Sequence, residues 1–124
     1  MSDRYERFWG STIVFARSFA WKQVFRTSLL YVSDDDVTIR HPFRRAWTLE
    51  RAQVADIVEV WDSGWWVLFR LTSGGPGSQL FEARDGVVDA LERFAWPVVA
   101  DSRQHGLSLL DIWRNRGNGT DAPS

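Results

Sequence analysis

The two histidines are the residues best suited to acid–base or metal chemistry in this 124-residue sequence, and they stand far apart. His41 and His105 are its only histidines, and it contains no cysteine. A catalytic or metal site needs a positioned partner beside such a residue. Neither histidine has a carboxylate at a spacing that suggests one, so we interpret both as structural. The sequence therefore predicts no catalytic residue, no metal site, no cofactor and no enzymatic activity.

Two loops contain residues that bind ions in other proteins. The run Asp34–Asp36 lacks the alternating oxygen ligands, central glycine and terminal glutamate of a calcium-binding EF-hand loop. The segment Gly74–Ser78 is rich in glycine but lacks the lysine of a phosphate-binding loop, and it precedes a predicted strand. Because aspartate and glycine are also common turn formers, we interpret both segments as turns.

Arginine side chains form the most prominent polar cluster. Residues 40–51 contain four arginines and one glutamate, whereas residues 52–101 contain eight acidic residues and three arginines. An exposed basic loop of this kind can dock an acidic protein, an anionic lipid surface or nucleic acid. Alternatively, it is a solvated loop that faces the acidic half of its own domain. Trp66 shares a strand face with Arg70, so we expect it to be partly exposed and able to stack. The predicted binding surface consists of Arg40, His41, Arg44, Arg45, Arg51, Trp66 and Arg70.

Short apolar segments separated by turn residues predict the elements that position this surface. The apolar residues alternate with polar ones or form β-branched and aromatic runs, which favours strands. The predicted strands are 12–17, 29–32, 37–40, 46–49, 54–61, 65–72 and 79–83. The two strands around Asp34–Asp36 form a hairpin. Asp85 then caps an amphipathic helix, Val87–Ala95, which Pro97 ends. We expect Trp47, Trp61 and Trp65, which lie in strands, to belong to the core.

About six to seven strands in sequence followed by one helix predict an α+β fold. Specifically, we expect a strongly bent antiparallel β-sandwich or barrel closed by the C-terminal helix. The expected organisation is a polar N-terminal segment (1–10), a single domain (11–100) and a partly disordered C-terminal extension (101–124) with a short helix near 107–113.

This pattern resembles the bacterial pleckstrin-homology-like (PH-like or GRAM-like) domains over roughly residues 28–96. The residues that carry the resemblance are Leu29–Arg40, Trp47–Leu49, Val54–Ile57, Trp66–Leu71 and Val87–Ala95. The resemblance implies a seven-stranded bent sandwich closed by a helix, and a role in binding lipids, peptides or proteins. Phosphoinositide-binding members use a basic first hairpin loop, whereas Ser33–Asp36 is acidic here, which argues against an inositol lipid.

Composition narrows the compartment and the partner. A cysteine-free chain fits a reducing compartment, no apolar run approaches the ~20 residues that span a bilayer, and the N-terminus does not read as a signal peptide. We therefore expect a cytoplasmic protein. With a net charge of −1, nucleic acid is not an expected partner. The sequence leaves the oligomeric state open.

These observations favour a non-enzymatic binding or adaptor module that recognises a protein partner. Three alternatives stay open. The first is a peripheral membrane-associated module that binds an anionic lipid surface. The second is a small enzyme or a barrel that binds an apolar ligand, and the third is an immunity-type inhibitor of a toxin. The membrane alternative rests on Arg7, Phe8, Trp9, Arg17, Phe19, Trp21, Lys22, Phe25 and Arg26.

Overall fold

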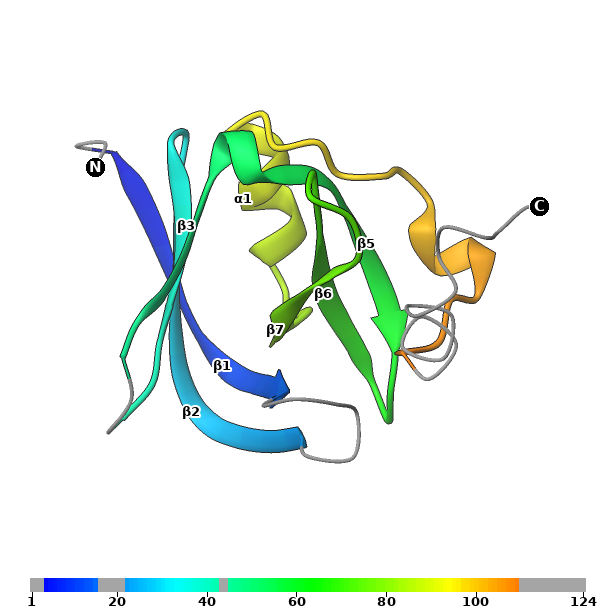
Figure 1. Ribbon diagram of the computed structural model, residues 1–124, viewed down its shortest axis with the longest axis horizontal. Helices are drawn as coiled ribbons and strands as arrows, with labels where there is room; N and C mark the ends of the chain where they lie inside the picture. The colour runs from blue at the N-terminus through cyan, green and yellow to red at the C-terminus, as the bar shows by residue number, and fades with distance from the viewer. Residues whose placement is uncertain (1–3, 16–21, 43–44, 110–124) are drawn as a thin grey trace.

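A computed structural model describes residues 4–15, 22–42 and 45–109 of the chain. Seven strands form one antiparallel sheet, accompanied by one short α-helix and by 3-10 turns (Figure 1). The elements are β1 (Tyr5–Phe15), β2 (Lys22–Ser33), β3 (Asp36–Arg40), β4 (Trp47–Glu50), η2 (Arg51–Gln53), β5 (Val54–Trp61), β6 (Trp65–Leu71), β7 (Pro76–Glu82), α1 (Val87–Arg93) and η3 (Ser102–His105).

The local predictions are largely confirmed. β2 and β3 form the predicted hairpin around the aspartates, although β2 begins at Lys22, seven residues before its predicted start. β4, β5 and β6 lie where the apolar runs placed them, whereas β7 begins at Pro76, so only the start of the predicted turn Gly74–Ser78 is a turn. The helix ends at Arg93, with Phe94 as its C-cap residue three positions before Pro97. The prediction that Asp85 caps the helix is wrong, because Gly86 is the N-cap residue and no side chain caps the helix. β1 is longer than predicted: it begins at Tyr5, crosses the expected boundary at residue 10 and pairs with β2. The predicted helix near 107–113 lies mostly outside the described residues.

The strand order is β4-β3-β2-β1-β7-β6-β5, so β4 and β5 are the two edges of the sheet. The sheet bends strongly, and its two halves, β1–β4 and β5–β7, face each other with α1 packed between them (Figure 1). Gly10 lies on β1 near the bend, where a Cβ would come within 2.8 Å of the Phe81 ring. Glycine at this position therefore allows β1 to approach β7 closely.

The predicted α+β sandwich or barrel closed by a helix is wrong, because the sheet stays open and the fold is mostly β. The outward N–H groups of β5 already have acceptors in residues 97–109, which we call the C-terminal segment. Ile57 N donates to Pro97 O (3.0 Å), Glu59 N to Ser102 Oγ (3.0 Å) and Trp61 N to Leu107 O (2.9 Å). A ladder between β4 and β5 would need these same groups, so the barrel cannot close.

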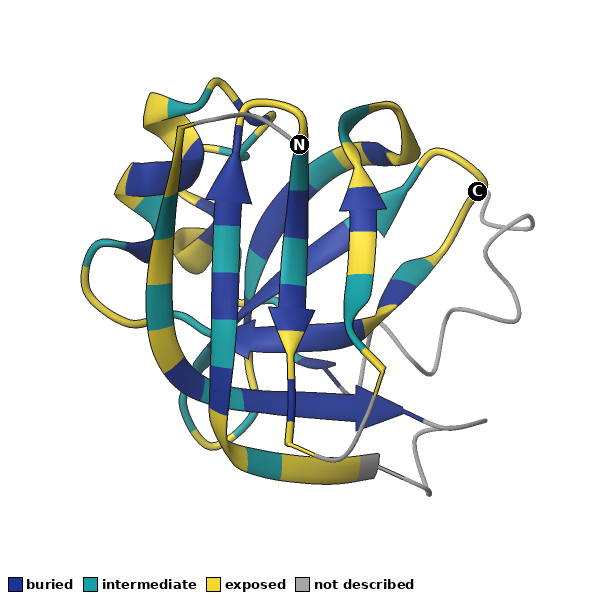
Figure 2. Ribbon diagram, turned by 90° about the vertical axis from the view of Figure 1, so that its left-hand side faces the viewer, coloured by how far each residue is buried: buried dark blue, intermediate teal, exposed yellow. Residues whose placement is uncertain are grey.

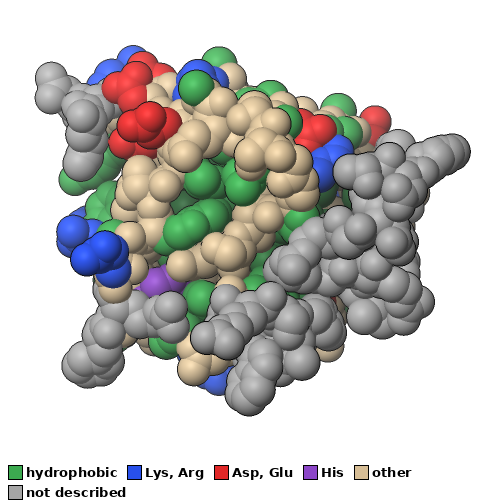
Figure 3. Space-filling model, in the orientation of Figure 1, with side chains coloured by type: hydrophobic (Ala, Val, Ile, Leu, Met, Phe, Trp, Pro, Cys, Tyr) green, Lys and Arg blue, Asp and Glu red, His purple; other side chains and the backbone are tan. Residues whose placement is uncertain are grey.

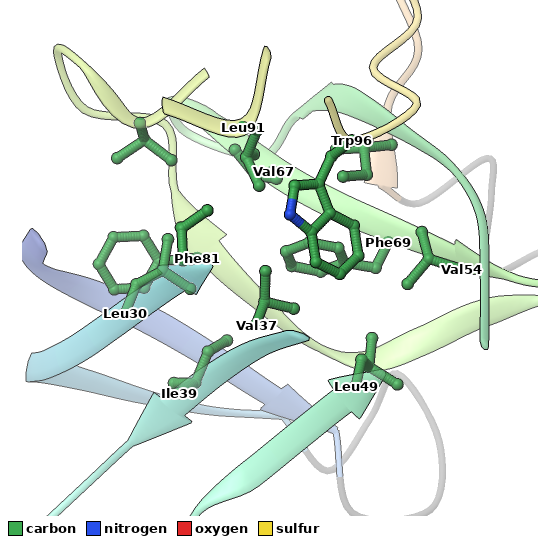
Figure 4. Packing of buried hydrophobic residues seen from close by; sticks show 13 residues of the cluster. Leu30, Val37, Ile39, Leu49, Val54, Val67, Phe69, Phe81, Leu91 and Trp96 are labelled. Carbon is green, nitrogen blue, oxygen red and sulfur yellow. The ribbon is translucent and has the colours of Figure 1, made fainter. Parts of the chain in front are cut away.

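On the side of β4, where no backbone ladder joins the two halves, side chains fill the seam between them. The Trp47 ring on β4 meets the Phe69 ring on β6 edge-on, with centroids 6.1 Å apart. A Cβ at Gly77 on β7 would lie 3.2 Å from the same indole. Figure 3 shows apolar side chains in this seam, and Figure 4 shows the buried residues behind it. Trp47 is thus partly buried in the core, as expected.

An inner core lies between the two halves and beneath α1. Leu30, Ile39 and Leu49 from one half pack against Phe69 and Phe81 from the other. The helix contributes Val87 and Leu91, and Trp96 follows it into the same cluster (Figure 4). The Trp96 indole Nε1 donates to Ser33 O at 2.7 Å, and Arg93 pairs with Glu6 at 2.6 Å. The helix is therefore fastened to β1 and to the β2–β3 turn.

The outer face of the sheet differs between the halves. Over β5–β7 and the end of β1, a second core forms around Ile13, Val58 and Leu68, and the C-terminal segment covers it with Leu109. Over β1–β4 no described segment covers the outer face (Figure 2). Along these strands buried residues of the inner face alternate with more accessible residues of the outer face. This uncovered half is where a binding surface can form.

Candidate binding surface

Arg51, one of the predicted binding residues, is used within the fold. Its guanidinium donates to the carbonyl oxygens of Asp34 (2.6 Å), Ala95 (2.7 Å) and Phe94. It also lies over the Trp96 ring, 4.6 Å from the centroid. Arg51 therefore ties the β2–β3 turn to the end of α1, and few of its donors remain for a partner.

Arg70 and Trp66 are likewise engaged within the fold. Arg70 forms a bidentate pair with Asp56, with N–O distances of 2.6 and 2.8 Å, and this hydrogen bonding raises the pKa of the guanidinium. Trp66 is 9% exposed, and its Nε1 donates to Asp62 O at 2.9 Å. The expectation that Trp66 is exposed for stacking is therefore wrong, because the C-terminal segment covers that side of β6.

His41 belongs to a buried polar cluster that sequence spacing did not reveal. Its Nδ1 lies 3.1 Å from Ser28 Oγ, its Nε2 lies 2.7 Å from Gln79 Oε1, and its ring centroid is 4.8 Å from that of Phe25. A serine–histidine contact is also the geometry of an activated nucleophile. Ser28 is only 1% exposed, however, so its hydroxyl is not accessible to a substrate in this structure. The cluster joins β2, β7 and the end of β3.

The predicted binding residues are therefore divided between contacts within the fold and accessible positions. Arg40 and Arg45 are exposed, and Arg44 lies outside the described residues. Since Arg51, Arg70 and His41 have partners within the fold, Arg40 and Arg45 are the described members still accessible. His105 lies in η3, beside β5, whereas His41 follows β3.

Of the described residues on which the membrane alternative rests, some pack within the fold and others are exposed. Phe8 packs against the inner core and Phe25 against His41, whereas Arg7, Trp9 and Arg26 are exposed. Arg17, Phe19 and Trp21 lie outside the described residues. Within the described parts of the chain, we find no helix with the length and apolar character needed to cross a bilayer.

The outer side chains of β1–β4 form three rows across the strands, which we call the open face. Residues paired across neighbouring strands lie on the same side of a sheet, so the register defines the rows. The central row is Arg7, Tyr31, Thr38 and Thr48. The row on one side of it is Tyr5, Ser33, Asp36 and Glu50. The row on the other side is Trp9, Leu29 and Arg40.

Aromatic rings and hydroxyl groups dominate the centre of this face. Tyr5 is 48% exposed and Trp9 is 57% exposed, and the Tyr5 and Tyr31 rings lie 5.6 Å apart. Thr38 and Thr48 are hydrogen-bonded through their hydroxyls at 2.9 Å. A shallow groove of about 440 Å3 runs between Tyr5, Tyr31, Thr38, Arg40 and Thr48. Exposed aromatic residues beside polar groups are typical of protein contact surfaces.

Charge is separated along the strands of the open face. Asp36 and Glu50 lie in one outer row, and Arg40 lies in the other. Along β3, Asp36 comes two residues before the uncharged Thr38, and Arg40 comes two residues after it. At about 3.3 Å per residue, Asp36 and Arg40 are roughly 13 Å apart. In Figure 3, acidic side chains gather at the upper left and basic side chains lower on the left margin. Along β3 the face is therefore uncharged in the middle and oppositely charged at its two ends, and Arg7 on β1 is the charged residue of the central row.

The free edge of β4 offers little backbone for pairing with another strand. Arg51 N donates to Asp35 O, so the backbone of Arg51 points toward β3. Because backbone groups alternate in direction along an antiparallel strand, the N–H and C=O groups of Thr48 and Glu50 point toward the free edge. Glu50 N donates to Gln53 Oε1 at 2.8 Å and is therefore already satisfied. A four-residue edge with one side-chain cap is a typical protection against strand addition. The open face therefore offers more accessible contact area than this edge.

The β5–β6 hairpin exposes a second aromatic pair. Trp61 is 50% exposed, contrary to its expected place in the core, and meets the Trp65 ring edge-on at 5.4 Å. Arg103 lies over Trp65 at 4.9 Å and pairs with Glu59 at 2.7 Å. A groove of about 400 Å3 adjoins Trp65. Since Arg103 already occupies the ring face, this hairpin offers less free aromatic surface than the open face.

Sequence reasoning overlooked the open face because it placed residues 1–10 outside the domain. The aromatic residues Tyr5, Phe8 and Trp9, a type enriched in strands, were the signal that could have identified β1. Among the described residues, no three acidic or histidine side chains come close enough to hold a metal ion. Comparisons with family models, curated proteins and solved structures gave no match to this chain. The PH-like resemblance stays a prediction.

Proposed function

We propose that this chain is a non-enzymatic binding module that recognises a protein partner through the open face. The observation that carries the proposal is the uncovered half of the outer sheet face, where Tyr5 and Tyr31 line a groove and Trp9 is exposed on the same face. Aromatic side chains of this kind contribute most of the binding energy in protein interfaces. The other half of the same face is sealed by the C-terminal segment.

The proposal differs from the sequence-based expectation in the surface that it uses. Arg40 is shared by both, but Arg51, Arg70 and Trp66 are replaced by residues of β1, β2 and β4. The groove falls within the ~300–1,000 Å3 range of ligand sites, and it is shallow enough to take protein side chains. The lipid alternative has less support, because Phe8 and Phe25 pack inward.

A peptide-display selection against the full chain tests this proposal. Selected peptides are titrated into the isotopically labelled protein, and the shifted amides are mapped. We expect shifts at Tyr31, Thr38 and Thr48, and at least roughly tenfold weaker binding by Tyr5→Ala, as for an aromatic hot spot. Trp61→Ala is the matched control, because the two rings are 48% and 50% exposed and each has one ring neighbour among the described residues. Loss of binding in Trp61→Ala with unchanged binding in Tyr5→Ala would refute the proposal.

A further inference from the structure

From its charge pattern, we infer that the open face is covered by a second copy of this chain when no partner is bound. The two copies pack face to face about a twofold axis. The inference rests on the proposed function, since it concerns the same surface. In such an interface each residue near the axis meets its own counterpart, whereas residues on opposite sides of the axis meet each other. A self-complementary face is therefore neutral at its centre and oppositely charged on either side.

The open face satisfies this condition along β3. With the axis along the central row, Thr38 meets Thr38 of the second copy. Asp36 then faces Arg40 of the other molecule, and Arg40 faces Asp36. On β1 the same operation places Tyr5 opposite Trp9, so that the two rings, 48% and 57% exposed, cover each other. Two sheets pack face to face in this manner within proteins, about 10 Å apart.

The net charge supports the same conclusion. The chain carries a net charge of −1, and proteins close to neutrality repel one another weakly. The charges of the open face are therefore not opposed by a strong overall field. Arg7 is the exception within the central row, because the twofold axis brings it near its own counterpart. The geometry thus predicts that removing this charge strengthens the contact.

The size of the face sets the strength of the association. Four strands about 4.8 Å apart and about five residues along each strand give a face on the order of 300 Å2. A standard interface buries about 800 Å2 on each partner. We therefore expect a weak dimer, with a dissociation constant on the order of 100 µM. A partner that binds the open face would displace the second copy, so self-association would regulate access to the site.

Sedimentation velocity of the full chain tests this inference directly. Between about 10 µM and about 1 mM protein, a span that brackets the expected constant, the wild type should shift from monomer to dimer. The shift should weaken between about 50 mM and about 500 mM NaCl, because salt screens the charge pairs. A wild-type chain that stays monomeric throughout would overturn the inference, while the peptide titration would still test the proposed function by itself.

Charge reversal identifies the face. Arg40→Asp alone and Asp36→Arg alone should each remain monomeric, because each places like charges opposite each other. An equimolar mixture of the two variants should dimerise, since both contacts are then complementary, and the double variant should regain the wild-type behaviour. Arg7→Gln should associate several-fold more tightly than the wild type. Glu92→Arg, an exposed change on α1, should leave association unchanged. A mixture that stays monomeric while the wild type dimerises would contradict this geometry, and circular dichroism of each variant verifies that it is folded.

Discussion

At the residue scale, Arg51 connects parts of the chain that are distant in sequence. Its guanidinium contacts the carbonyl oxygens of Asp34, Phe94 and Ala95 and the ring of Trp96. These contacts follow from a planar group with several fixed donors, which lysine cannot reproduce. The role of Arg51 is therefore to position the helix end over the inner core.

We predict that Arg51→Lys lowers the free energy of unfolding by about 1–3 kcal/mol, the cost of losing hydrogen bonds to a charged donor. Urea denaturation followed by tryptophan fluorescence measures this change. Arg45→Lys serves as the control, because Arg45 is exposed, and should change stability by less than about 0.5 kcal/mol. Equal stability of the two variants would show that the carbonyl contacts contribute little.

The tautomer of His41 is a second prediction at this scale. In the neutral imidazole, the proton lies on Nε2 because Gln79 Oε1 accepts and cannot donate, and Nδ1 then accepts from the Ser28 hydroxyl. Long-range nitrogen–proton spectra of the imidazole should show the Nε2–H form. Gln79→Leu should cost about 1–3 kcal/mol by leaving a buried donor without an acceptor. Observation of the Nδ1–H form would contradict the assignment.

At the scale of elements, the C-terminal segment determines which half of the sheet is available. Its carbonyls accept from β5, and Leu109 enters the outer core with 0% exposure. The alternation in Trp65–Leu71 predicts one apolar face of β6 and a second face, which contains Trp66 and Arg70, that is partly exposed. It could not show what covers the second face, because that contact joins residues more than 30 positions apart.

Leu109→Ala should therefore destabilise the protein by about 2–5 kcal/mol, the range for truncating a buried leucine. Leu107→Ala should cost less, because Leu107 is only partly buried. Chemical denaturation of both variants compares them. A smaller loss for Leu109→Ala than for Leu107→Ala would mean that the segment does not seal the outer core as described.

At the scale of the whole molecule, sequence reasoning could predict the strands but not their closure. Period-two patterns in residues 29–40 and 54–71 specify strands and hairpins, since the information is local. Whether β4 pairs with β5 depends on competition for the N–H groups of Ile57, Glu59 and Trp61 by the C-terminal segment. The contacts of Arg51 could not be predicted for a related reason, because its partners Asp34, Phe94 and Ala95 lie far from it in the sequence. Arg70 instead pairs with Asp56 on the neighbouring strand of its own hairpin.

The seam filled by Trp47 is the whole-molecule feature that mutation can test. Trp47→Ala should lower stability by about 2–3 kcal/mol, below the range for fully buried tryptophans because Trp47 is only partly buried. Hydrogen exchange should accelerate in β3 and β4 more than in β5 and β6. Uniform acceleration across all strands would show instead that the two halves open as one unit.

The central claim is that the open face, and neither the basic 40–51 segment nor the Trp61 hairpin, is the contact surface of this protein. Amide and indole spectra of the labelled full chain, recorded as its concentration is raised, test this claim directly. We predict shifts confined to the three rows, greatest at the Trp9 indole and at Thr38 and Arg40. Shifts centred on Trp61 and Trp65 would contradict it, and spectra that do not change with concentration would overturn the self-association of this face.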